Sequence, residues 1–333
     1  MMAKIVTLGE IMLRLSTTVG ERVASSNQFC AHYGGGEANV AISLANFGHA
    51  VSFASKIPEN ALGEGVKQHL QRYGVDCRYL LRGGQRLGTY YVETGIGERA
   101  AQVIYDRKGS SFAEMTKNEW PTDMFEHVEI FHISGITPAL SKHWQHTLIE
   151  LVKSAKQAGV KISLDINFRG KLWTIDEAKE YLKQLLPYVD VCSAGKLDAQ
   201  VFMDIPAPKE ETDDQYYYDQ MNQLYPNIDL FYGTHREVIS ASHHLLTGRL
   251  WHQGNYVLSP VHVIDPIVDR VGGGDAFAAG VLHGIATQSS DQELIDFATA
   301  ASALKHTIYG DCNLFSVSEI NEFMKNGSGK IIR

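Results

Sequence analysis

The chain has 333 residues, which is enough for one large domain with a small accessory element or for two modest domains. Hydrophobic residues make up 44% and charged residues 20%, as is usual for a globular enzyme. The net charge of −8 argues against a nucleic-acid partner and against a polybasic membrane contact. We therefore look for a function among small-molecule partners.

Four cysteines stand far apart and form no Cys-x-x-Cys pair: Cys30, Cys77, Cys192 and Cys312. This spacing argues against a disulfide framework and a zinc knuckle, so we expect reduced and buried thiols. The N-terminal residues resemble a strand and not a signal peptide, and no run approaches the ~18 apolar residues of a membrane span. We expect a cytoplasmic protein.

The first third of the chain alternates between strand-like and helix-like segments and then changes character. We expect strands over residues 4–9 and 51–57, a more polar continuation over 11–15, and helices from the glycines at 34–36 through 47 and over 61–73. Between residues 87 and 107 two β-type runs, 89–93 and 101–105, are separated by Gly95 and Gly97. This pattern favours a hairpin.

From about residue 130 strands and helices follow each other regularly. We expect strands over 129–134, 161–167, 189–193 and 229–232, and helices over 142–158 and 175–186. This alternation predicts a parallel sheet with helices on both faces. The acidic, tyrosine-rich residues 209–220 are typical of a solvated surface segment.

Three consecutive glycines, Gly272, Gly273 and Gly274, precede Asp275 and a helix-like run over 276–286. Glycine leaves backbone N–H groups open to an anion, and the helix dipole favours negative charge at the same place. An anion hole beside a carboxylate is suited to phosphoryl transfer, because the hole stabilises the moving phosphate and the carboxylate accepts the hydroxyl proton. The residues alone leave an alternative in which Asp275 is only a helix N-cap.

Residues 269–277, Asp-Arg-Val-Gly-Gly-Gly-Asp-Ala-Phe, resemble the second signature of the ribokinase-like (PfkB) family of sugar kinases. The resemblance implies that Asp275 is the catalytic base and that Gly272, Gly273 and Gly274 form the anion hole. Residues 34–41, Gly-Gly-Gly-Glu-Ala-Asn-Val-Ala, resemble the first signature. Gly34, Gly35 and Asn39 are then expected to bind the sugar, whereas without the second signature a tight turn with no ligand explains them equally well.

This resemblance extends over nearly the whole chain and implies a ribokinase-like fold. We expect a doubly wound, mostly parallel α/β sheet with helices on both faces, built from residues 1–10, 34–85 and 109–333. A small β-sheet lid over the sugar would comprise residues 11–33 and 86–108. ATP and Mg²⁺ are the expected cofactors, and a requirement for a monovalent cation stays open.

Three further runs resemble the 2-keto-3-deoxygluconate kinases within the family: residues 105–110, 134–140 and 165–169, the last followed by Leu172-Trp173. In that subgroup the matching residues line the sugar-acid site, which implies Tyr90, Tyr105, Arg107, Asn167 and Arg169 as substrate-binding residues. Arginine suits a carboxylate because its planar fork donates two parallel hydrogen bonds. Fructokinases share residues 165–169 and the Leu-Trp pair, and exposed arginines are often merely solvated.

Two segments depart from the family pattern at the expected nucleotide end. The family usually has Asn-x-x-Glu, with the glutamate acting through water on magnesium, where this chain has Ser193-Ala-Gly-Lys196. A Gly-x-x-Gly nucleotide loop is replaced by Gly233-Thr-His-Arg236. Either Lys196 and Arg236 neutralise phosphate charge directly, with Ser193 and Gly233 beside the nucleotide, or this end is degenerate.

No residue set predicts a protein metal centre, because His143 and His146 lie three apart without a third ligand. We expect an ATP-dependent kinase that phosphorylates the terminal hydroxyl of 2-keto-3-deoxygluconate, and we expect a homo-oligomer. One alternative is a fructokinase or another PfkB-family sugar kinase. A second is a catalytically weak sugar- or nucleotide-binding regulator, against which the intact Asp275 argues.

Overall fold

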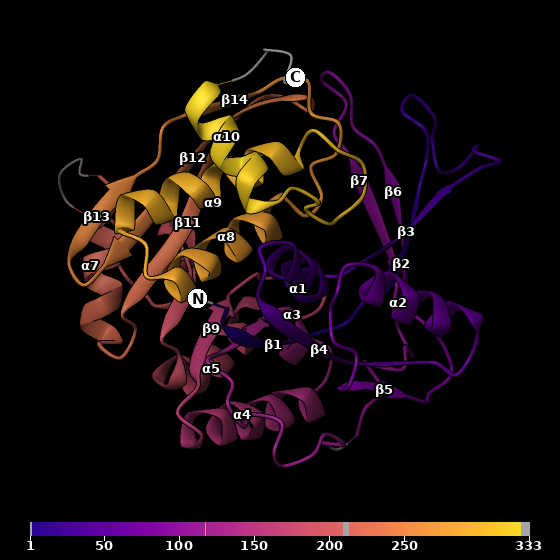
Figure 1. Cartoon of the computed structure of the whole chain (residues 1–333), viewed down its shortest axis with the longest axis horizontal. Helices are drawn as coiled ribbons and strands as arrows, with labels where there is room; N and C mark the ends of the chain where they lie inside the picture. Colours follow the sequence, from indigo (N-terminus) through magenta and orange to yellow (C-terminus); the bar gives the residue numbers. More distant parts are fainter. Residues whose placement is uncertain (1, 117, 209–212, 328–333) are drawn as a thin grey trace.

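Two β-sheets organise the chain in the computed structural model, which describes residues 2–116, 118–208 and 213–327 (Figure 1). Within these residues the larger sheet has ten strands in the order β13-β12-β11-β10-β9-β8-β1-β4-β5, with β14 paired to β12. Their bounds are β1 Lys4–Leu8, β4 Ala50–Ile57, β5 Leu80–Arg82, β8 Ile130–Ser134, β9 Lys161–Asp165, β10 Val191–Ser193, β11 Leu230–Ser240, β12 His243–His252, β13 Asn255–Leu258 and β14 His262–Ile264.

Strands β5 to β11 along this order are parallel, and β12, β13 and β14 add antiparallel pairs at one end. Parallel strands need apolar side chains on both faces, since helices cover each face. In β1, Val6 and Leu8 pack into one apolar cluster while Ile5 packs into the other. The doubly wound α/β sheet expected from the sequence is thereby confirmed.

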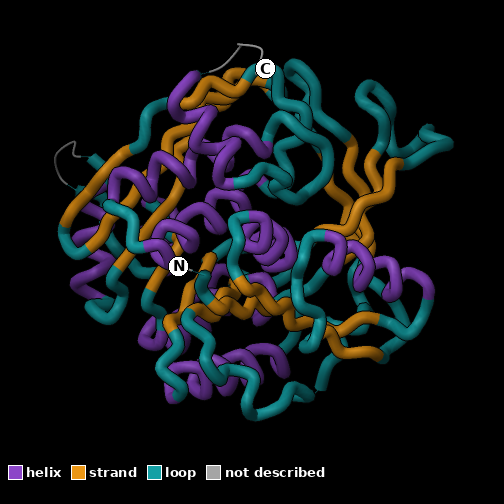
Figure 2. Tube along the Cα trace, viewed as in Figure 1, coloured by secondary structure: helices purple, strands orange, loops and turns teal. Residues whose placement is uncertain are grey.

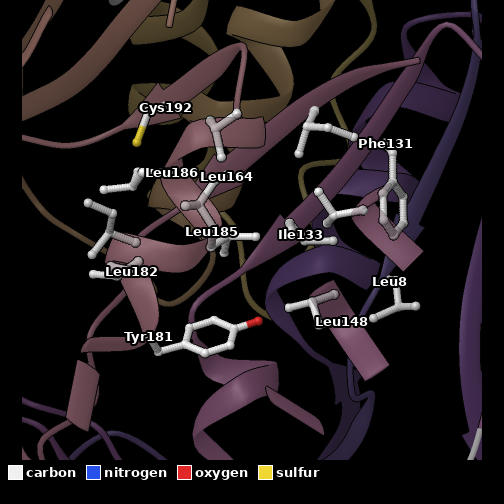
Figure 3. Packing of buried hydrophobic residues seen from close by; sticks show 14 of the residues in the cluster. Leu8, Phe131, Ile133, Leu148, Leu164, Tyr181, Leu182, Leu185, Leu186 and Cys192 are labelled. Carbon is white, nitrogen blue, oxygen red and sulfur yellow. The ribbon is translucent and has the colours of Figure 1, made fainter. Parts of the chain in front are cut away.

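Helices cover both faces of the large sheet. One cluster, part of which Figure 3 shows, takes side chains from α4 Lys142–Gln157, α5 Ile175–Leu185, α6 Lys196–Phe202 and α7 Gln215–Leu224. The other takes side chains from α1 Gly36–Asn46, α2 Ala61–Arg72, α8 Gly273–Thr287, α9 Asp291–Lys305 and α10 Val317–Asn326. The short helix α3 Ile136–Ala139 joins β8 to α4, and a 3₁₀ helix over Leu186–Tyr188 joins α5 to β10. Each face is therefore closed by its own apolar core.

A smaller sheet has four strands in the order β3-β2-β6-β7 within the part of the chain that the structure describes. They are β2 Met12–Ser16, β3 Cys30–Gly34, β6 Thr89–Glu93 and β7 Gln102–Asp106. Figure 2 shows these strands running together beside the main body. β6 and β7 are antiparallel, as the hairpin pattern predicts, and all four strands fall in the segments expected to form a lid, with only Gly34, the last residue of β3, beyond them. The lid boundaries themselves stay a prediction.

Two expectations for the C-terminal half are wrong. The tyrosine-rich run expected to be solvated contains helix α7, in which Tyr217, Tyr218 and Met221 are buried, while residues 209–212 lie outside the described residues. The expected nucleotide loop at residues 233–236 lies instead inside the long strand β11, because β12 pairs with it in register from Leu230 to Val238. Both differences arise from tertiary packing that no local pattern contains.

None of the helices in the described ranges is both long and apolar enough to cross a bilayer.

Candidate active site

A cavity of about 280 Å³ lies where the two sheets meet. Its floor comes from the carboxyl ends of parallel strands: Glu10 follows β1, Ile136 follows β8 and Asp165 ends β9. Tyr90 and Arg107 reach it from the smaller sheet and the segment after β7. Ligands of open α/β sheets bind at this edge, so the cavity is the candidate active site.

The start of helix α8 forms one wall of the cavity. Gly272 is the N-cap residue with φ 83°, and a Cβ there would lie 1.7 Å from the carbonyl oxygen of Asp311. A side chain at this position is therefore excluded both by backbone conformation and by space. Asp275 is the third residue of the helix and its side chain caps no backbone group. The alternative in which Asp275 is only an N-cap is wrong.

Asp275 faces Asn39 across the site. The Nδ2 atom of Asn39, on helix α1, donates a hydrogen bond of 2.7 Å to Asp275 Oδ2. Burial is the main reason that the pKa of Asp275 is raised to about 6, and the hydrogen bond from Asn39 opposes this rise. A carboxylate with a pKa slightly below neutral pH is mostly ionised there and still basic, which suits it to accept a proton.

The three glycines before Asp275 differ in what they face. Gly272 and Gly274 line the cavity, whereas Gly273 packs against His306, whose ring would lie 2.4 Å from a Cβ at that position. The N–H groups of Gly274 and Asp275 have no acceptor among the described residues. First-turn amides of this kind can receive an anion, and the role of the glycines as an anion hole stays a prediction.

The glycines of the first signature also divide. Gly35 lines the cavity, and a Cβ there would lie 2.1 Å from the carbonyl oxygen of Glu10. Gly34 ends strand β3 and faces Asp311 and Tyr90, outside the cavity lining. Gly34 is thus placed to allow strand β3 to approach Asp311 closely, and its expected role in binding the sugar stays a prediction.

Two tyrosines of the smaller sheet that line the cavity form a stacked pair. The rings of Tyr90 and Tyr105 lie 5.7 Å apart, and Tyr105 is 44% exposed. The hydroxyl of Tyr90 is engaged, because it donates to Asp311 Oδ2. Tyr90 therefore faces the cavity with its ring and not with a free hydroxyl, whereas the ring of Tyr105 is partly exposed beside the cavity.

The two arginines expected to bind a sugar acid are in different states. Arg107 is largely buried and pairs with Glu10, to which Arg107 Nε donates at 2.8 Å. Arg169, in the loop after β9, is exposed and makes no ion pair in the described part of the chain, and its Nη1 donates to the carbonyl of Phe168 at 3.2 Å. Arg169 is therefore the unpaired cation of the cavity, and Arg107 is a cation held in place with donors to spare.

Asn167 lies between Asp165 and Arg169 with φ 41°, in the left-handed region. Non-glycine residues adopt this conformation rarely and often at functional sites. The turn brings Asn167, Asp165 and Arg169 to the cavity lining together. The Asp-x-Asn-x-Arg motif is therefore presented to the cavity as a unit.

Two of the several carboxyl groups that line the cavity, Glu37 and Asp165, have no role in the predictions from the sequence. Burial raises the pKa of each to about 7, and the charge of Asp275 contributes in both cases. Ser134 donates to Glu37 at 2.5 Å, whereas the side-chain carboxyl of Asp165 accepts no hydrogen bond among the residues described. Glu37 lies inside the first glycine-rich signature, and Asp165 begins the Asp-x-Asn-x-Arg motif. The neighbouring residues in these motifs were the signal that could have pointed to both carboxyl groups.

Asp165 is the group that fits a magnesium ion. Mg²⁺ in phosphoryl-transfer sites is held by one or two carboxylates, with phosphate oxygens and water completing the shell. An ionised Asp165 carboxylate accepts no hydrogen bond among the described residues and lies near the like charge of Asp275, and a bound cation would compensate that negative charge. Among the described residues, no three or more His, Cys, Asp or Glu side chains are grouped so that they could hold a metal ion by themselves. His146 lies instead beside Glu150, and His143 contacts Thr147.

The expected nucleotide residues lie outside this cavity lining, at the ends of β10 and along β11. Ser193 ends β10 and pairs with Tyr232, the residue before Gly233 on β11. Lys196 begins α6, and its Nζ lies 5.5 Å from the centroid of the Tyr217 ring. Arg236 lies further along β11, and its Nε has no hydrogen-bond partner in the part of the chain described. Burial and the charge of Arg270 lower the pKa of Arg236.

The chain matches known proteins along its whole length. The model of the pfkB family carbohydrate kinases matches residues 2–316. A 2-dehydro-3-deoxygalactonokinase of Haloferax volcanii is 30% identical over 100% of both chains. A crystal structure of a PfkB family carbohydrate kinase from Listeria grayi has a TM-score of 0.94 at 46% identity, covering 97% of this chain and 100% of that chain. A 2-dehydro-3-deoxygluconokinase from Thermotoga maritima has a TM-score of 0.93 at 36% identity with the same coverage.

Fold, cavity and signatures together define a carbohydrate kinase, and the chain belongs to the pfkB family. The two glycine-rich signatures are therefore correctly recognised, and so is the likeness to kinases of 2-keto-3-deoxy sugar acids. Membership of a kinase family implies ATP as the phosphoryl donor with Mg²⁺. The particular roles of the site residues stay predictions.

Proposed function

We propose that this kinase phosphorylates the terminal hydroxyl of 2-keto-3-deoxygluconate, giving 2-keto-3-deoxy-6-phosphogluconate and ADP. The observation that supports this substrate is the unpaired Arg169, which shares one cavity with the Asn39–Asp275 pair. A 2-keto-3-deoxy sugar acid has a carboxylate at one end and a primary hydroxyl at the other. A cation and a proton acceptor on the same cavity match these two ends.

The proposed reaction assigns the proton to Asp275. The substrate hydroxyl oxygen forms a bond to the γ-phosphorus while the bond from that phosphorus to the β,γ-bridging oxygen of ATP breaks, and ADP leaves. Asp275 accepts the hydroxyl proton, and the free amides of Gly274 and Asp275 stabilise the charge of the transferred group. Bound Mg²⁺ would neutralise phosphate charge, and Asp165 is the residue that would hold it.

The nucleotide end is part of the same proposal. The residues expected to bind the nucleotide lie at the end of β10, at the start of α6 and on β11, outside the lining of the sugar cavity. They are Ser193, Lys196, Gly233 and Arg236. Lys196 and Arg236 make no ion pair within the described residues, so no carboxylate neutralises either charge. Where the family uses an acid and a glycine, two cations would neutralise the triphosphate directly.

The test is an ADP-release assay with the purified protein and a panel of sugars. We expect the highest kcat/KM for 2-keto-3-deoxygluconate, with its galactonate epimer next and fructose far lower. A charge-assisted hydrogen bond contributes about 1.5–3 kcal/mol, so loss of the carboxylate predicts about 10–10²-fold lower kcat/KM. A preference for fructose would support the neutral-sugar alternative, and no turnover with any sugar would support a binding regulator.

We also propose that the protein is cytoplasmic and forms a homo-oligomer. Light scattering of the purified chain at several concentrations measures the oligomeric state, and a monomer at all concentrations would contradict it.

A further inference from the structure

Lys305 is the last residue of helix α9, and its side chain is 0% exposed. Its ammonium nitrogen lies 3.1 Å from the carbonyl oxygen of Asp269 and 3.4 Å from that of Ile308. Lys305 forms no ion pair with a carboxylate in the described part of the chain. A fully buried lysine held mainly by backbone carbonyls is unusual, because burying an ammonium group is costly.

The charges around Lys305 explain why it stays buried. Arg14, on lid strand β2, pairs with Asp269 at 2.7 Å and also with Asp311. With Lys305 included, the cluster contains two cations and two anions. Burial lowers the pKa of Lys305, while the charges of Asp269 and Asp311 raise it. Removal of the ammonium would therefore leave one uncompensated negative charge and two carbonyls without a donor.

The two carbonyl groups belong to segments that hold the glycine turn from opposite sides. Asp269 precedes the turn, and its carboxylate accepts the N–H groups of Val271 and Gly310, both at 3.1 Å. Ile308 precedes the segment in which the Asp311 carbonyl packs against Gly272. The ammonium of Lys305 bridges these two segments, so it fixes the position from which the turn presents its amides.

We propose that Lys305 is a tethered monovalent cation that positions the glycine turn: its ammonium occupies a cradle formed by the carbonyl oxygens of Asp269 and Ile308. Backbone carbonyl oxygens can replace the hydration shell of a monovalent cation of this kind. An ammonium group on a side chain supplies the same charge permanently. The kinase is then independent of monovalent cations, and Lys305 is a positioning residue that touches no substrate.

The first test uses the wild-type protein. Its kcat and its unfolding temperature are compared in potassium, ammonium and tetramethylammonium chloride at equal ionic strength. We expect the same values in all three salts, because the cradle is already filled. Activation or stabilisation by potassium over tetramethylammonium would overturn the proposal.

The second test empties the cradle. Lys305→Ala makes room for a free ion, and we expect kcat in tetramethylammonium to fall about 10²-fold, as for displaced catalytic groups. Potassium, ammonium or methylammonium chloride should restore much of the loss and raise the unfolding temperature. Lys305→Met fills the space without a charge, so it should lose activity and respond to no salt. Lys325→Ala removes an exposed lysine from the last turn of α10 and serves as the control.

The unfolding measurement needs neither sugar nor ATP, so it separates this proposal from the proposed substrate. Wild-type activity of Lys305→Ala in tetramethylammonium would show that the ammonium positions nothing. A Lys305→Ala protein that no monovalent cation stabilises, or that folds in none of the salts, would show that the carbonyls form no cation cradle. Each of these outcomes overturns the proposal.

Discussion

Asn39 and Asp275, 236 positions apart in the chain, are joined by a hydrogen bond of 2.7 Å from Nδ2 to Oδ2. This single contact brings the two glycine-rich signatures together, because Asn39 lies on α1 and Asp275 on α8, which pack side by side (Figure 1). Asn39 is buried, so its amide holds the carboxylate in one orientation toward the cavity. The geometry of the proposed base therefore depends on both signatures.

We predict that Asp275→Asn lowers kcat by about 10²–10⁴-fold, as is typical for loss of a general base. The amide keeps the size of the carboxyl group but cannot accept the hydroxyl proton. The measurement is kcat for ADP release together with the unfolding temperature. Wild-type turnover by a folded Asp275→Asn protein would rule out the base assignment.

The pH dependence of the reaction should report the same group. With a pKa raised to about 6, Asp275 is protonated below that pH, so kcat should fall as the pH decreases through about 6. The hydrogen bond from Asn39 stabilises the charged form, and Asn39→Leu should therefore move the acid limb to higher pH. Profiles of kcat against pH for both proteins check this, and an unmoved limb in Asn39→Leu contradicts it.

Local patterns in the sequence predicted most of the fold. Apolar runs and the residues that end helices are local features, so the strands and helices from residue 130 to 193 appear close to their expected bounds. Helix α7 was not predicted, because the acidic residues around Tyr217 and Tyr218 are typical of a surface segment. Only the folded structure shows that these two side chains pack into the core. The continuation of β11 through Arg236 was missed as well, since only its pairing with β12 keeps it extended.

The candidate site was predictable where a motif carried it and not where two distant residues form it. Asp275 and Asn39 stand in recognisable signatures, and the structure places both on the cavity. The pairing of Arg107 with Glu10 joins residues 97 positions apart. The sequence alone therefore gives no distinction between Arg107 and Arg169, although only Arg169 is free of an ion pair within the described residues.

This difference predicts different behaviour for the two arginine variants. Arg169→Ala should raise KM for 2-keto-3-deoxygluconate and lower kcat/KM about 10–10²-fold, with little change in stability, because it removes an exposed cation. Arg107→Ala should also lower the unfolding temperature, since it leaves the buried carboxylate of Glu10 without its partner. Kinetics on the sugar acid and on fructose, with thermal unfolding, separate the two effects. Equal loss on both substrates in Arg169→Ala would argue against carboxylate recognition.

The nucleotide end predicts a kinetic effect confined to ATP. Lys196→Ala and Arg236→Ala should each raise KM for ATP and leave KM for the sugar acid nearly unchanged, because neither residue lines the sugar cavity. Arg236 should have the larger effect, because a partly buried guanidinium without a carboxylate partner gains most from a phosphate oxygen. Lys171→Ala, an exposed lysine in the loop after β9, is the matched control. Initial rates at varied ATP and saturating sugar give the comparison, and unchanged KM for ATP in both variants would mean that the two cations lie outside the nucleotide site.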